Sequence, residues 1–148
     1  MRLSCQKLFP LLLVATIACR DATAPLTLPA QFNLENINGR PVPTFFSPTP
    51  GLTPTILSAS LTLDNAGKAV MTEHRREFDG TETTITNTFD YRIKGNQIEI
   101  GSFQPCPPNA NCIGTLKGTI SGEALSLTVV AISIDGSIVY NYRIAPTL

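Results

Sequence analysis

The residues with the greatest chemical potential form a short basic cluster, in which His74, the only histidine of the chain, is followed by Arg75 and Arg76. Imidazole and guanidinium groups donate hydrogen bonds to a carboxylate or a similar polar head group. If they face the inside of a domain with aliphatic walls, those walls can accept an apolar tail. The cluster therefore predicts binding of a small apolar or amphiphilic molecule.

The alternation of the strand predicted at 81–94 decides which side chains point inside. Its apolar residues, such as Ile85 and Phe89, occupy odd positions, so odd positions face the core. A two-residue turn at Asp79-Gly80 then places the even positions of the preceding strand inside, and a four-residue turn at 64–67, which pairs Leu61 with Val70, gives the same result. The predicted ligand-binding residues are Thr72, His74, Arg76, Asn87 and Tyr91. Met71, Glu73, Arg75 and Glu77 are predicted to face outward.

An alternative position for this cluster stays open. A register slip of one residue moves every side chain of a strand to the opposite face, and would leave His74 and Arg76 outside the domain. They could also lie at the rim, in water. The threonines between 81 and 88 are typical of a solvated strand.

No catalytic or metal-binding constellation accompanies the cluster, and we do not expect an enzyme. Hydrolysis through serine or cysteine needs a nucleophile, a base and an orienting group, and no serine lies in a nucleophile-elbow pattern. Asp79, Glu82 and Asp90 lie beside turns, where acidic residues are typical of solvated strand ends. No cofactor is predicted.

The segment Tyr91–Ile100 shows best how the strands are formed. Its apolar and polar residues alternate on both sides of Gly95-Asn96, as in an antiparallel hairpin with a type II′ turn. This register pairs Ile93 with Ile98 and Tyr91 with Ile100. The pattern returns 27 residues later around Gly122-Glu123, which indicates a meander.

Similar alternation along the chain predicts eight strands in an all-β, antiparallel, up-and-down barrel, because closure removes exposed sheet edges. A one-residue bulge near 129–131 is expected, so that Val130, Ile132 and Ile134 can face the last strand. Between Thr44 and Thr55, prolines predict a long loop. In that loop Phe45 and Phe46 could plug one end of the barrel or form a lid over a ligand.

The amino-terminal region predicts export. Arg2 and Lys7 precede an uncharged apolar run, 8–18, whose 11 residues are too few to span a bilayer as a helix. We therefore expect a signal peptide with a signal helix at 1–18, a tether at 19–30 and a barrel domain at 31–148.

Composition narrows the partners of the exported chain. Of 11 Lys and Arg, two lie in the signal, so nine face 11 Asp and Glu, a net charge of −2. Such a surface does not favour nucleic acid or a polybasic membrane patch. Aromatic residues make up 7% and tryptophan is absent, so a stacking platform for sugars or bases is not expected. We expect a monomer.

The two cysteines of the predicted domain, Cys106 and Cys112, are separated by five residues of a proline-containing loop. An exported pair in an oxidising compartment favours a structural disulfide. A metal or redox site is not indicated, because there is no Cys-x-x-Cys and the histidine is distant in sequence.

Two resemblances extend these expectations. Ala15-Thr16-Ile17-Ala18-Cys19 resembles a bacterial lipobox, which implies that Cys19 is lipidated and holds the protein on a membrane; Arg20 implies the outer membrane, facing the periplasm. The opening Phe32–Pro43, with its Asn-Gly turn and prolines, and the glycine-centred hairpins resemble small lipocalin-like and META-domain bacterial lipoproteins. The resemblance implies a ligand-binding barrel. The alternative is an envelope protein-interaction or stress module whose barrel is filled by side chains, with function on its loops.

Overall fold

The computed structural model describes residues 26–45, 53–103, 115–130 and 137–146, and all the helices and strands assigned within these ranges are β-strands. The predicted signal helix lies outside them. The strands are β1 (Ala30–Ile37), β2 (Arg40–Pro41), β3 (Thr44–Phe45), β4 (Thr55–Leu63), β5 (Lys68–Arg76), β6 (Glu82–Lys94), β7 (Gln97–Gly101), β8 (Leu116–Ser121), β9 (Ala124–Val130) and β10 (Ser137–Ile144).

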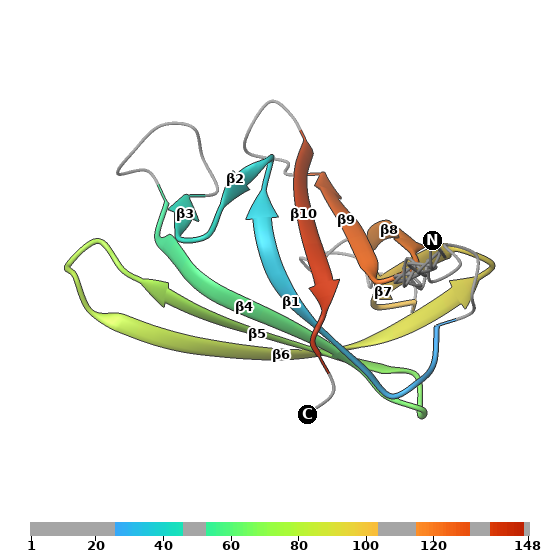
Figure 1. Cartoon of the computed structure of the whole chain (residues 1–148). Helices are drawn as coiled ribbons and strands as arrows, with labels where there is room; N and C mark the ends of the chain where they lie inside the picture. The colour runs from blue at the N-terminus through green and yellow to red at the C-terminus, as the bar shows by residue number, and fades with distance from the viewer. Residues whose placement is uncertain (1–25, 46–52, 104–114, 131–136, 147–148) are drawn as a thin grey trace, which may run out of the picture.

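Eight of these strands form a closed antiparallel barrel (Figure 1). From β4 to β10 each strand pairs with the next one in the sequence, β10 pairs with β1, and β1 pairs with β4 to complete the circle. The short strands β2 and β3 extend the sheet where β1 and β4 separate. The predicted fold class, an up-and-down barrel of eight strands, is confirmed.

Turn chemistry fixes the register of the two hairpins that the sequence identified. Gly95 has φ +63° and Gly122 has φ +57°, the left-handed conformation required at the first position of their turns. Across the first turn Ile93 pairs with Ile98, and across the second Ile120 pairs with Leu125. Both predicted registers are confirmed.

The core occupies the inside of the barrel and consists of side chains from alternating strand positions. In β1, for example, Ala30, Phe32 and Leu34 are buried while Gln31 and Asn33 are exposed. Burying a side chain such as leucine or phenylalanine contributes roughly 1.5–3 kcal/mol. The largest fully buried side chains are Tyr142, Phe32, Ile37, Ile56, Leu61, Leu63, Ile98, Ile100, Leu125 and Leu127.

Gly118 of β8 lies where a side chain would clash with β9. A Cβ atom built there would lie 2.2 Å from the carbonyl oxygen of Ser126 and 2.7 Å from Cδ2 of Leu127 on β9. Since Gly118 pairs with Leu127, the missing side chain lets the leucine occupy the core next to it.

The predicted bulge in β9 is wrong. Tyr142 pairs with Leu125, Tyr140 with Leu127 and Ile138 with Val129 in one unbroken register. The inward residues of β9 therefore match those of β10 directly. The described pairing of the two strands runs as far as Val130 and Ser137. Ile132 and Ile134 lie outside the described residues.

Candidate functional site

The predicted ligand-binding residues lie on two different faces of the sheet. On β5, Thr72 pairs with Ser60 and Thr86, and His74 pairs with Ser58 and Thr84, all on the outer face. Arg76 pairs with Glu82 on the same face. The prediction that Thr72, His74 and Arg76 point inside the barrel is therefore wrong.

The cause of this error is one extra residue in each turn that flanks β5. Leu63 pairs with Ala69, not with Lys68, and Gly67 adopts φ +80°. At the other end, the backbone N–H of Glu77 donates to Thr81 O at 2.8 Å, and Gly80 has φ +85°. A left-handed glycine that closes a longer turn is typical of a bulged hairpin connection, which shifts the register by one residue relative to a two-residue turn.

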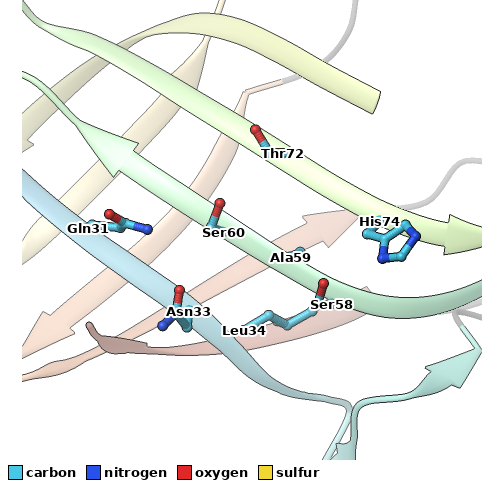
Figure 2. A pocket seen from close by; sticks show the side chains of 8 residues that line it. All are labelled: Gln31, Asn33, Leu34, Ser58, Ala59, Ser60, Thr72 and His74. Atoms are coloured by element: carbon cyan, nitrogen blue, oxygen red, sulfur yellow. The ribbon is translucent and has the colours of Figure 1, made fainter. Parts of the chain in front are cut away.

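The outer face carries an open pocket of about 300 Å³ that Thr72 and His74 help to line (Figure 2). It forms where β1 and β4 diverge: their pairing ends at Asn33 and Ser60, after which β1 pairs with β2 and β4 with β3. Hydroxyl and amide groups on such an open surface are satisfied by water, so we interpret the pocket as a solvated groove. Its lining is Gln31, Asn33, Leu34, Ser58, Ala59, Ser60, Thr72 and His74.

The charged groups on this face bind one another. Arg76 donates from Nη2 to Glu82 Oε1 at 2.8 Å, and His74 Nε2 lies 3.3 Å from Glu82 Oε2. The hydrogen bond from Arg76 is the main reason that the pKa of Glu82 is lowered. All three side chains are substantially exposed, so their ion pairs contribute little to stability.

Asn87 and Tyr91 of β6 do face inward, as predicted. Asn87 pairs with Met71 and remains exposed, so the inner face next to it is open to solvent. Tyr91 packs against the core, and its hydroxyl donates to the carbonyl oxygen of Asp64 at 2.5 Å. Burial is the main cause of a raised Tyr91 pKa, and the charge of Asp64 adds to it. This hydroxyl therefore holds the β4–β5 turn in place.

The register shift brings a different ionisable residue inside, Glu73, which the sequence had placed outside. It pairs with Ala59 of β4 and Ile85 of β6, so both strand neighbours are apolar and inward-facing. Burial raises the pKa of Glu73, and the charge of Arg75 partly opposes this shift. The two left-handed glycines at 67 and 80 were the signal in the sequence that could have identified Glu73.

Two tyrosines of β10 share the interior with this carboxylate. Tyr140 and Tyr142 stack with ring centroids 6.4 Å apart, and Tyr142 is 1% exposed. Burial is the main cause of a raised pKa at both phenols; the charge of Glu73 adds to the shift at Tyr140, and Tyr140 and then Glu73 add to the shift at Tyr142. The hydroxyl of Tyr142 is buried and has no hydrogen-bond partner. The interior thus contains three polar side chains, those of Glu73, Tyr140 and Tyr142, among apolar ones.

The remaining predicted residues are only partly described. Phe45 lies on β3 and is partly buried, whereas Phe46 lies outside the described residues, so the choice between plug and lid stays open. Cys19, Cys106 and Cys112 also lie outside them, and lipidation and the disulfide stay predictions.

The described residues contain neither a metal-binding cluster nor a membrane-spanning helix. Within the ranges given above, no three histidine, cysteine or acidic side chains gather as they would around a metal ion. Nor do these ranges contain a helix with the length and apolar character needed to cross a membrane.

Comparison with protein-family models, with curated proteins and with solved structures finds no significant match. The resemblance to lipocalin-like and META-domain lipoproteins therefore stays a prediction.

Proposed function

We propose that the protein binds a small amphiphilic molecule on the inner face of the barrel, over β5 and β6. The observation that carries this function is an apolar surface that faces inward and yet remains partly exposed. Met71, Ile85 and Phe89 all occupy inward positions on these strands, and each is only partly buried. A ligand tail placed there would remove apolar surface from water, at roughly 25 cal/mol per Å².

The neighbouring part of the interior supports this placement. Leu61 and Ala69 are 0% exposed, so the core closes immediately beside the accessible surface. Met71 and Phe89 pack against that core from the side of β5 and β6. The proposed binding surface therefore borders a buried apolar core, and Asn87 and Glu73 supply polar groups beside it.

Membrane attachment through Cys19, in the outer membrane and facing the periplasm, belongs to the same proposal. It is supported by the lipobox-like sequence and by the short apolar run before it. A lipid-anchored barrel would exchange amphiphiles with the membrane to which it is attached.

The test compares two arginine substitutions on β6 that differ in the face they occupy. Ile85→Arg places a charge on the proposed surface, whereas Thr88→Arg places it on the opposite, exposed face. Binding of N-phenyl-1-naphthylamine, an uncharged apolar fluorophore, is followed by its fluorescence. We expect Ile85→Arg to weaken binding about tenfold or more and Thr88→Arg to leave it unchanged.

Native mass spectrometry of the protein purified from its own host provides a second measurement. Absence of a co-purifying amphiphile, together with no fluorophore binding by the unaltered chain, would contradict the proposal. That result would favour the alternative, an envelope protein-interaction or stress module whose barrel is filled by side chains. The buried core is also consistent with that alternative.

A further inference from the structure

One edge of β6 is paired along only part of its length. On its first side β6 pairs with β5 from Glu82 to Asp90, but on its second side it pairs with β7 only from Asp90 to Lys94. Among the described residues, no other strand pairs with this second side, and β6 extends well beyond β7 (Figure 1). We call the stretch 82–89, on the side away from β5, the free edge.

The hydrogen bonds at the two ends of the β5–β6 ladder show which backbone groups the free edge presents. The N–H of Tyr91 donates to Gly67 O at 2.9 Å, and the N–H of Glu77 donates to Thr81 O at 2.8 Å. Antiparallel strands bond to a given neighbour through alternate residues, so the odd positions of β6 bond to β5. The backbone N–H and C=O groups of the even positions therefore point away from β5. These positions are Glu82, Thr84, Thr86 and Thr88.

The free edge has none of the features that usually keep a sheet edge from pairing. Proteins protect such edges with proline, lysine or a bulge, and the stretch 82–89 contains no proline and no lysine. Its one charged residue, Glu82, already pairs with Arg76 and His74. Five of its eight residues are β-branched, which favours a strand. Ile85 and Phe89 are only partly buried, so an added strand would also cover apolar surface.

We propose that the free edge pairs with the free edge of a second copy of this chain, antiparallel and about a two-fold axis at Ile85. Both chains contribute the same stretch, so the assembly closes as a dimer. This dimer takes the place of the monomer expected from the sequence. The inference does not depend on the amphiphile site.

Length and charge select the centre of the pairing. With the axis at Ile85, Glu82 pairs with Thr88 and Thr84 with Thr86 of the second copy, so every even position of the free edge has a partner. An axis at Thr86 would place Glu82 opposite Asp90, a like charge whose backbone already pairs with β7. An axis at Thr84 would leave Thr88 opposite Gly80, outside the strand.

The first measurement is the mass of the purified full chain by sedimentation equilibrium. We expect twice the mass of one chain. Thr86→Pro should reduce it to one chain, because proline removes an N–H that faces the second copy and no bond to β5. Thr86→Ala, the matched control, keeps that N–H and should retain the dimer. Circular dichroism checks that the proline variant keeps its strands.

Cysteine cross-linking tests the register without the proline variant. With the axis at Ile85, this residue lies opposite its own copy as a non-hydrogen-bonded pair, with Cα atoms about 4.5 Å apart, which a disulfide can bridge. The two copies of Thr83 are offset along the strands by about 14 Å, at roughly 3.4 Å per residue. Under an oxidant we expect Ile85→Cys to form covalent dimers and Thr83→Cys, on the same face, to form none. The unaltered chain, with its own cysteines, is the blank.

Three results would overturn the dimer. The unaltered chain would have the mass of one chain, which would leave the free edge to solvent or to another protein. A folded Thr86→Pro variant would remain a dimer, which would place the interface elsewhere. Thr83→Cys would cross-link as readily as Ile85→Cys, which would exclude the pairing about Ile85.

Discussion

Removing the same hydroxyl group at two tyrosines should change stability in opposite directions. Tyr142→Phe deletes a buried hydroxyl that has no partner, whereas Tyr91→Phe deletes one that donates to Asp64 O at 2.5 Å. A buried unsatisfied group costs about 1–3 kcal/mol, and a typical hydrogen bond contributes about 0.5–1.5 kcal/mol. We expect Tyr142→Phe to raise the free energy of unfolding by about 1 kcal/mol and Tyr91→Phe to lower it by about 1 kcal/mol.

The assay is urea unfolding of protein stripped of ligand, followed by tyrosine fluorescence or circular dichroism. With a slope of about 1.5 kcal/mol per molar urea, the two midpoints should move apart by roughly 1.3 M. Each substitution keeps the aromatic ring and removes only the hydroxyl, so a change in stability reports the hydroxyl and not a loss of packing. A loss of 1 kcal/mol or more in Tyr142→Phe would show that its hydroxyl is already satisfied, which would refute this reasoning.

Three further outcomes follow from the structure. Gly118→Ala should lower the free energy of unfolding by about 3 kcal/mol through overpacking. The control Gly95→Ala, in a turn where the new Cβ meets nothing within 4 Å, should lower it by about 1 kcal/mol. Equal losses in urea unfolding would contradict the close contact between β8 and β9. Glu73→Gln should stabilise the protein at neutral pH but not below pH 4.5. The pKa of Glu73 is raised on folding, so the unaltered protein loses stability as the pH rises from the unfolded pKa of 4.5 through the folded pKa, and the glutamine variant does not. If urea unfolding gives the same difference at every pH, Glu73 is solvated. His74→Ala should leave fluorophore binding within twofold, and a larger loss in titration would move the site to the outer face.

The sequence was sufficient for the strand order because the order depends on local signals. Alternation and turn glycines located the strands, and two-residue turns at Gly95 and Gly122 fixed their registers without reference to the rest of the chain. For β6 the apolar residues at odd positions were numerous enough to assign the inward face.

For β5 the same reasoning failed because neither face is clearly more apolar. Ala69 and Met71 alternate with Val70 and Thr72, so hydrophobicity alone does not select a register. The register of β5 could then be inferred only from the turns that flank it. Asp-Gly is compatible with both a two-residue turn and a longer one closed by a left-handed glycine. The bulge predicted in β9 failed because the inward residues of β10 pair with Leu125, Leu127 and Val129, so the two strands need no change of phase.

The candidate site was the part least accessible from sequence. Its inward polar residues, Glu73 and Tyr142, are 69 residues apart in the sequence, and only barrel closure places both on one inner face. Tyr142 was recognised as an inward residue, but nothing local distinguishes a tyrosine whose hydroxyl finds a partner from one whose hydroxyl does not.

The lengths of two turns decide which charged side chains of β5 face the inside of this barrel. One face of β5 carries Glu73 and Arg75, the other carries His74 and Arg76, and the turns with glycines at 67 and 80 place the face with Glu73 inside. Shortening one turn alone would shift the pairing register of β5 with one neighbouring strand but not with the other. The orientation of β5 therefore depends on both turns. Shortening both by one residue would exchange Glu73 and Arg75 on the inner face for His74 and Arg76, and so would remove the one carboxylate of β5 from the interior without a single substitution.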